Sequence, residues 1–336
     1  MEALIHPYDI QDAESLSGYN SVIGLLQRQL VKVSESEWEI PCIPKFDHDL
    51  LQKRKAEDDL PTDIATHPFP TFTIPSPVNP GTKPLFPEVY FSLFADQEIG
   101  TVPQIDDLAA SLIRDAIVDT IDQLEINRDV CAKFLVDLDC YWSLETFAKR
   151  GVTFDKFREA IGDKVMYKSE DMIIDAIFSQ LFKLPTAEYK YVYYDSLIIQ
   201  CCKIAPAAIA PSLGRAIRTV YKNMHAMDLE LGYRFLDWFT HHVSNFEFRW
   251  RWAEWFGFPH SETAKANYVR IDDLQLSDLN PKKAFMIAAL DKEIRLSFAK
   301  RIRGTLPEEL YSLIPSRLDE DNSPEFKYDK PGKSFS

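Results

Sequence analysis

The sequence is poor in glycine, which makes up only 11 of its 336 residues. Tight β-turns and phosphate-binding loops need glycine at fixed positions, so its scarcity disfavours a many-turned β fold and a glycine-rich nucleotide site. The stretch PGKS at 331–334 resembles the end of a phosphate loop, but Lys327 stands where the first glycine of that motif would be. We therefore expect no nucleotide site there.

An excess of positive charge is also missing, since 52 Asp and Glu outnumber 38 Lys and Arg and the formal net charge is −14. Binding to nucleic-acid phosphates depends on Lys and Arg, so this balance disfavours a general nucleic-acid coat and leaves only a local basic patch open. The five cysteines lack metal-ligand spacing and predict reduced thiols in an intracellular protein. No run approaches the roughly 18–20 apolar residues of a membrane helix, so no membrane association is expected.

Catalytic and metal-binding motifs are missing too. Neither G-x-S-x-G nor H-E-x-x-H occurs. His241 and His242 would point ~100° apart on a helix and could not chelate one ion from a single turn, and the pair Cys201 and Cys202 has the same geometry. We therefore expect no catalysis, no metal and no cofactor, with the two histidines satisfied in a core or an interface. An enzyme that uses the polar groups near the tryptophans is the alternative.

What the sequence does contain is helical periodicity. Apolar residues recur at three- and four-residue steps, which is typical of helices with one buried face. The run at 189–204 is apolar on most sides and is predicted to lie centrally in a bundle. The rhythm of ~15–20-residue helices with short connections predicts an all-α fold, an antiparallel, HEAT-like helical-repeat array. Helices are expected over 88–94, 105–126, 128–150, 169–182, 189–204, 213–227, 229–246 and 281–303.

Composition divides the chain into five parts. In the second part, residues 61–87, prolines are interleaved with phenylalanines. This pattern excludes a helix and predicts an extended segment docked on the helical surface, or a ligand for an aromatic groove. The basic triplet at 53–55 is interpreted as a solvated helix face rather than a nuclear signal. The five parts are a helical lead-in at 1–60, interpreted as the remnant of a preceding domain, the Pro/Phe-rich segment at 61–87, a central helical-repeat domain at 88–258, a linker and the start of a third helical domain at 259–315, and a disordered tail at 316–336.

Aromatic residues concentrate in the stretch FLDWFTHHVSNFEFRWRWAEWFGF at 235–258, which holds four of the six tryptophans. Each aromatic side chain buries ~150–250 Å², so this density predicts a core, an interface or both. We favour a core role for Trp238, Trp250 and Trp255, and binding to a partner protein or to nucleic acid for the two arginines. The candidate residues for partner binding or core packing are Trp238, His242, Asn245, Phe248, Arg249, Trp250, Arg251, Trp252 and Trp255.

The segment FLDWFTHHVSNFEFRWRWAEW also carries a family resemblance. It closely resembles the motif that ends the second helical domain in the large-subunit family of the nuclear cap-binding complex. Three upstream segments support the resemblance in the same order, namely KPLFPEVYFSLF at 83–94, EDMIIDAIFSQLFKLP at 170–185 and YYDSLIIQCCKIAPAAIA at 193–210. The resemblance covers about residues 83–315, and the chain looks like a divergent, fungal and partial member.

The resemblance implies a fold of the initiation factor 4G middle-domain type, built from stacked antiparallel helix pairs. Family members carry three such domains, so we expect the first to be absent or reduced to 1–60 and the third to stop after one helix. It also implies a non-catalytic scaffold without a cofactor or a direct cap pocket.

The partners that the resemblance implies are those of a nuclear scaffold. An RRM-type small subunit binds the 7-methylguanosine cap of RNA, and the large subunit docks on it and keeps its cap-binding loops ordered, so capped RNA is reached indirectly. Factors for mRNA splicing, export and decay are recruited, in the nucleus and with shuttling to the cytoplasm. The alternative is a cytoplasmic translation-initiation scaffold of the initiation factor 4G type, which the tryptophan motif disfavours.

Overall fold

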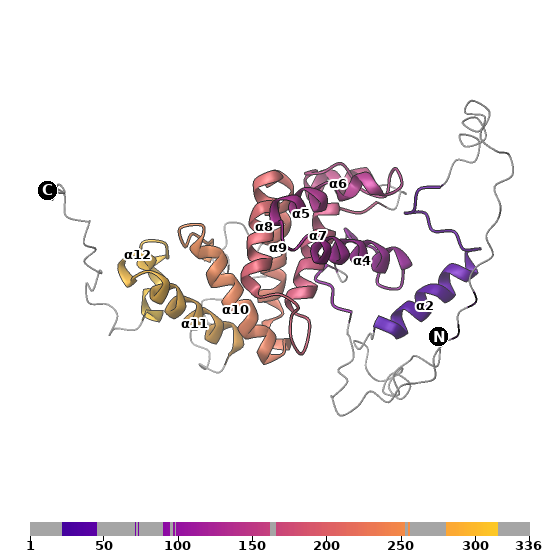
Figure 1. Ribbon diagram of the computed structural model, residues 1–336. Helices are drawn as coiled ribbons and strands as arrows, with labels where there is room; N and C mark the ends of the chain where they lie inside the picture. Colours follow the sequence, from indigo (N-terminus) through magenta and orange to yellow (C-terminus); the bar gives the residue numbers. More distant parts are fainter. Residues whose placement is uncertain are drawn as a thin grey trace. The chain divides into compact units, whose positions relative to one another are not determined.

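The computed structural model describes residues 22–45, 71, 73, 90–94, 97, 99–161, 166–252, 255 and 280–314 (Figure 1). Regular structure within these ranges consists of α- and 3-10 helices, and the isolated bridge between Phe147 and Tyr167 is the one β pairing there. The all-α prediction is therefore confirmed. No helix among the described residues is long and apolar enough to cross a membrane.

The described chain forms two compact units, which we treat separately. Unit 1 comprises residues 1–125, 133–179 and 183–186, and unit 2 comprises 126–132, 180–182 and 187–336. The five-part division of the sequence stays a prediction. Residues 1–21, most of the Pro/Phe-rich segment at 61–87, the linker at 259–279 and the tail at 316–336 lie outside the described residues.

Unit 1 is built around a helix that is buried on every side. Its elements are α2 (Val22–Glu35), α4 (Leu108–Gln123), the end of α5 (Arg128–Val136), η2 (Leu138–Tyr141), α6 (Phe154–Ile161) and most of α7 (Ser169–Leu181). Every residue from Lys168 to Ser179 is buried. The stretch at 189–204, expected to be apolar on most sides and central in a bundle, forms a helix that packs against two others, but Val192, Lys203 and Ile204 on it are exposed. Because α7 contains acidic residues, its hydrophobicity pattern does not indicate that it is buried on every side.

A buried ion pair connects α7 to α4. The Asp175 carboxylate pairs with the guanidinium of Arg114, and both side chains are almost fully buried. Asp175 also accepts hydrogen bonds from the Ser92 hydroxyl, at 3.0 Å, and from the backbone N–H of Leu93. Arg114 donates further to the backbone carbonyl of Phe91. The charge of Asp175 is thus compensated by one cation and two neutral donors.

Four predicted helices differ from the structure. The helix expected over 213–227 begins at Pro206 and ends at Lys222, with Pro211 inside it. The helix expected over 88–94 is absent from 90–94, because backbone groups of this segment turn toward the buried ion pair. The helix expected over 128–150 ends at Val136, and the 3-10 helix η2 follows it. The helix expected over 281–303 is broken at Ser297 and Phe298. Amphipathic periodicity continues across such breaks, so it does not reveal them.

Unit 2 contains the remaining helices. They are α8 (Tyr191–Ile204), α9 (Pro206–Lys222), η3 (Met224–Ala226), α10 (Leu229–Ser244), α11 (Pro281–Leu296), α12 (Ala299–Arg303) and η7 (Glu308–Leu313). Helix α8 packs against α9 and α10, and α10 also packs against α11. Pro206 and Pro281 open their helices in the first turn, where a missing N–H costs nothing. Helices α8 and α10 thus each pack against two other helices of the unit.

One carboxyl group of unit 2 is buried without a hydrogen-bond partner among the residues that the structure describes. Glu293 of α11 is fully buried, and neither of its carboxylate oxygens has a hydrogen-bond partner among the described residues. Burial alone raises the pKa of Glu293 to about 8, because the charged form loses its hydration without a compensating charge. The folded protein therefore holds a proton on this side chain at neutral pH.

The ion pair of unit 1 predicts a non-additive mutant cycle. Arg114→Ala should lower the free energy of unfolding by about 3–5 kcal/mol, because it leaves a buried carboxylate without its cation. The double variant Arg114→Met with Asp175→Leu should cost clearly less than the single change, since both charges are gone. Urea unfolding measures this. A double variant that is as unstable as the sum of its single variants would contradict the assignment.

Glu293 predicts that stability falls as the pH rises. Between the ordinary value of 4.5 and about 8, the folded state binds a proton that the unfolded state has released. This carboxyl therefore lowers stability by about 1.4 kcal/mol per pH unit across that window. In Glu293→Gln this contribution should vanish, so the variant gains stability over the wild type at pH 8 more than at pH 5. Glu308→Gln, an exposed change in the same unit, is the control. Parallel pH profiles for wild type and Glu293→Gln would refute the prediction.

Candidate functional site

Phe239 of α10 is the centre of an aromatic cluster in unit 2. Its fully buried ring meets Trp250 and Trp252 edge to face, with ring centroids 5.5 Å and 6.0 Å away. Trp255 lies 5.4 Å from the same ring, and Phe285 of α11 lies 5.8 Å from it. Edge-to-face aromatic contacts add to the stabilisation that burial provides. The chain after α10 therefore folds back and covers the helix it has just left.

A strained turn directs this reversal. Glu247 and Phe248 both have positive φ angles, +57° and +59°, which non-glycine residues seldom adopt. The Phe248 N–H donates to the carbonyl oxygen of Val243 at 2.8 Å, and the Phe248 side chain is 4% exposed. Burial of this ring and the hydrogen bond offset the backbone strain. The turn thereby brings Trp252 onto Phe239.

The four tryptophans of the stretch differ in burial. Trp238, Trp252 and Trp255 are buried, whereas Trp250 is only half-buried. Trp255 stacks on Tyr221 of α9 with centroids 4.0 Å apart and an interplanar angle of 8°. Helices α9, α10 and α11 therefore all contribute rings to one cluster.

The two adjacent histidines share one carboxylate. Asp195 of α8 is completely buried, and its two oxygens lie 2.7 Å from Nδ1 of His241 and 2.6 Å from Nδ1 of His242. The amide of Asn245 lies 3.4 Å from Asp195 and donates to the carbonyl oxygen of His241 at 2.9 Å. The ring of Trp238 stacks on His242 with centroids 5.1 Å apart. Side chains that diverge on one helix thus converge on a group from another helix.

Sequence reasoning missed Asp195. A single acidic residue inside the apolar run YYDSLII was its only signal, and its partners lie 46 and 47 positions further along. A buried carboxylate with this many nitrogen contacts fixes α8 against α10 rather than binding a ligand. No group of three or more His, Cys, Asp or Glu in the described ranges is arranged to hold a metal ion.

Basic side chains border the aromatic cluster. Arg249 and Arg251 are exposed, and Arg249 forms an exposed ion pair with Glu247 at 2.9 Å. Arg218 of α9 lies over Trp250, with its guanidinium carbon 5.7 Å from the ring centroid, and Arg301 of α12 lies over Phe248, at 5.3 Å. An exposed pair contributes little to stability, so Arg249 can exchange its partner at low cost. Partner binding through Arg249 and Arg251 stays a prediction.

Consecutive α-helices, packed in unit 2 around an aromatic cluster, are typical of all-α helical-repeat proteins. The chain belongs to the MIF4G-like family, whose model matches residues 103–308. This match includes α4 to α12 and the complete aromatic cluster, and it confirms the helical-repeat array expected from the resemblance.

Several curated relatives carry the name of one complex subunit. The chain is 36% identical to nuclear cap-binding protein subunit 1 of Schizosaccharomyces pombe over 97% of its own length. It is 31% identical to nuclear cap-binding protein complex subunit 1 of Saccharomyces cerevisiae over 66%, and 26% identical to nuclear cap-binding protein subunit 1 of Homo sapiens over 88%. It spans 38%, 25% and 32% of these relatives, respectively. The resemblance seen in the tryptophan motif therefore extends over most of the chain.

The cluster predicts that substitutions at two neighbouring residues change the stability by very different amounts. Trp252→Ala should lower the free energy of unfolding by about 3–5 kcal/mol, because it empties space beside Phe239. Arg251→Ala should change it by no more than about 0.5 kcal/mol, since the side chain is exposed. Chemical denaturation of both variants makes the comparison. Equal destabilisation by the two changes would show that the division between core and surface is wrong.

Proposed function

We propose that this protein is a non-catalytic scaffold subunit of the nuclear cap-binding complex. The observation that carries the proposal is the 36% identity over 97% of the chain to a protein named nuclear cap-binding protein subunit 1. Because the chain spans only 38% of that relative, the proposal concerns the part of the scaffold that the chain represents. The work of this part is to hold partner proteins, in the nucleus and during shuttling to the cytoplasm.

The proposed partner is an RRM-type small subunit that binds the 7-methylguanosine cap. In this proposal, capped RNA is held by the small subunit, and the large subunit keeps the cap-binding loops ordered. The supporting feature is a surface that needs no rearrangement: Arg249 and Arg251 extend from a segment whose neighbours Phe248 and Trp252 are buried. A pre-organised surface loses less conformational entropy on binding, and arginine is prominent among residues that dominate interfaces.

Factors for mRNA splicing, export and decay are the further partners of the proposed scaffold. Helical-repeat arrays offer several helix faces along one chain and can therefore hold more than one partner. A cytoplasmic translation-initiation scaffold is the rival function, and it would bind an RNA helicase instead of the small subunit.

The proposal predicts that the full 336-residue chain co-purifies with the RRM small subunit and is retained on 7-methylguanosine resin only when that subunit is present. Arg249→Ala combined with Arg251→Ala should weaken the complex by about tenfold, as expected when two interface arginines are lost. Isothermal titration calorimetry measures this affinity. The chain alone should pass through the resin.

The matched control is Arg295→Ala, which removes an arginine of similar exposure that also pairs with an acidic neighbour, Asp291. It should leave the affinity unchanged. The S. pombe relative serves as the positive control for capture. Failure of the chain to bind a small subunit that this relative binds would refute the proposal, and binding to a helicase alone would favour the translation scaffold.

A further inference from the structure

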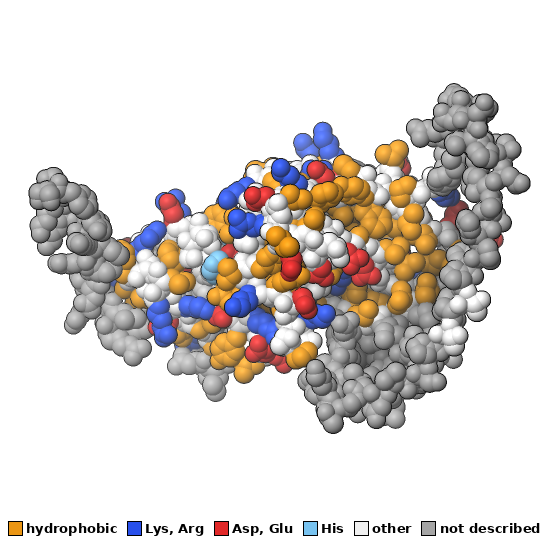
Figure 2. Space-filling view, in the orientation of Figure 1, with side chains coloured by type: hydrophobic (Ala, Val, Ile, Leu, Met, Phe, Trp, Pro, Cys, Tyr) orange, Lys and Arg blue, Asp and Glu red, His pale blue; other side chains and the backbone are white. Residues whose placement is uncertain are grey.

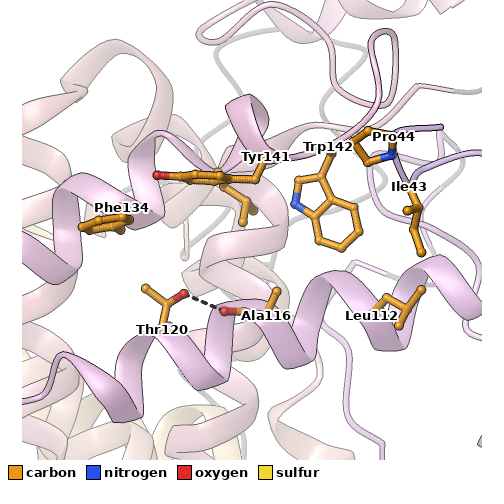
Figure 3. A pocket seen from close by; sticks show the side chains of 9 residues that line it. Ile43, Pro44, Leu112, Ala116, Thr120, Phe134, Tyr141 and Trp142 are labelled. Carbon is orange, nitrogen blue, oxygen red and sulfur yellow. Dashed lines mark hydrogen bonds between the residues drawn. The ribbon is translucent and has the colours of Figure 1, made fainter. Parts of the chain in front are cut away.

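An apolar groove lies on unit 1, and none of the residues used above for function lines it. Its volume is about 420 Å³, and Figure 3 shows side chains of α4 along its floor with aromatic rings opposite. Leu112 and Ala116 are among the floor residues, and Phe134, Tyr141 and Trp142 form the wall. The space-filling view in Figure 2 shows hydrophobic side chains gathered over this part of the molecule, with acidic side chains beside them.

The wall of the groove exposes aromatic surface to solvent. Phe134 and Tyr141 are 46% and 56% exposed, and their rings lie nearly parallel, 6.3 Å apart with an interplanar angle of 14°. Exposed apolar surface that gathers in one concave place is typical of a binding site. A volume of this size holds a few residues of an extended peptide rather than a folded domain.

The polar groups of the groove favour a ligand that can accept a hydrogen bond. The indole N–H of Trp142, a residue of the wall in Figure 3, is buried without an acceptor among the described residues. The Thr120 hydroxyl is already committed, because it donates to the carbonyl oxygen of Ala116 at 2.7 Å. The groove therefore offers an N–H donor that a slight turn of the indole would present to a bound carbonyl.

A proline-rich segment meets this demand better than a helix or a strand. A polyproline II chain has no internal hydrogen bonds, so its carbonyl oxygens are free to accept, and its prolines bring no N–H groups that would need acceptors. Proline rings pack on flat aromatic surfaces, and the chain is already extended before it binds. A helix would bring carbonyls that are already bonded, and a strand would bring unpaired N–H groups.

Charge at the groove specifies the ligand further. Asp115 and Asp119 follow Leu112 and Ala116 by three positions each, so they border the apolar floor on one side. Neither carboxylate forms an ion pair within the described ranges. Burial and the neighbouring charge of Asp119 raise the pKa of Asp115, so a cation placed here would relieve an existing repulsion.

We propose that this groove binds a proline-rich, extended segment of a partner protein, with a basic residue of that segment placed against Asp115 and Asp119. The prolines pack between the α4 floor and the aromatic wall, and one of their carbonyls accepts the Trp142 N–H. This site is independent of the cap-binding role proposed above. Its failure and the failure of that role would be separate results.

The test is a titration of the ¹⁵N-labelled full chain, followed through the indole N–H signals in NMR spectra. The probe is an acetylated, amidated peptide with one arginine before a short run of prolines. The Trp142 signal, assigned by its loss in Trp142→Phe, should shift on titration up to about 1 mM peptide. Replacing the arginine of the peptide by glutamate should weaken binding about fivefold or more, and replacing the prolines by glycine and serine should abolish the shift.

Matched variants separate the contributions. Trp142→Phe keeps an aromatic ring but removes the donor, and it should weaken binding, followed on backbone signals, about fivefold. Trp38→Phe, the same change at an exposed tryptophan of unit 1 outside the groove, should not alter it. Asp115→Asn with Asp119→Asn should make the arginine and glutamate peptides bind equally. Phe134→Ala tests the wall without changing the donor, and it should also weaken binding.

Several results would overturn the proposal. One is an unshifted Trp142 signal at the highest peptide concentration, which includes the case in which residues 61–87 of this chain already occupy the groove. Another is equal binding of the proline and glycine–serine peptides, because it would mean that the arginine alone is recognised. A third is equal affinity of wild type and Phe134→Ala, because the aromatic wall would then not be the binding surface.

Discussion

A buried carboxylate must be satisfied from several directions at once, and this constraint organises both compact units. In unit 1, Asp175 pairs with Arg114 and accepts hydrogen bonds from a hydroxyl and a backbone N–H of a second segment. In unit 2, Asp195 collects two histidines from α10. An unpaired charge in either place would cost several kcal/mol. The helices around each aspartate therefore have few alternative registers, and the units gain a defined arrangement that apolar packing alone would leave looser.

The amphipathic helices and the buried tryptophan core could be predicted because both depend on local spacing. The stripe of Ile113, Ile117 and Ile121 is buried as its period indicates. The central position of α7 could not be predicted in this way, because the partner of Asp175 lies 61 residues away and makes a polar helix buriable. The turn at Phe248 could not be predicted from the sequence either, because no glycine marks its positive φ angle. The periodicity of apolar residues predicts which face of a helix is buried. Whether the rest of the helix is also buried depends on partners that lie far away in the sequence.

The aromatic cluster explains how a scaffold segment can be both irregular and rigid. Residues 249–252 follow a helix end, where chains usually lose order, yet Trp252 is 1% exposed and packs against Phe239. The arginines alternate with these tryptophans, so burying every second side chain presents the basic ones to solvent. This alternation gives the proposed docking surface its shape without requiring a regular strand. The packing therefore holds the proposed docking surface in place before any partner binds.

The two candidate surfaces differ in the chemistry that they offer. Arg249 and Arg251 present cations on a rigid base and suit a folded partner with acidic or planar groups. The groove of unit 1 presents aromatic rings, an N–H donor and an acidic edge, and it suits an extended basic ligand. A scaffold with both surfaces can hold a folded subunit permanently and a proline-rich tail transiently, because a short extended segment buries little area and dissociates quickly. If both proposals hold, the opposite charge of the two surfaces would keep each ligand from binding in the place of the other.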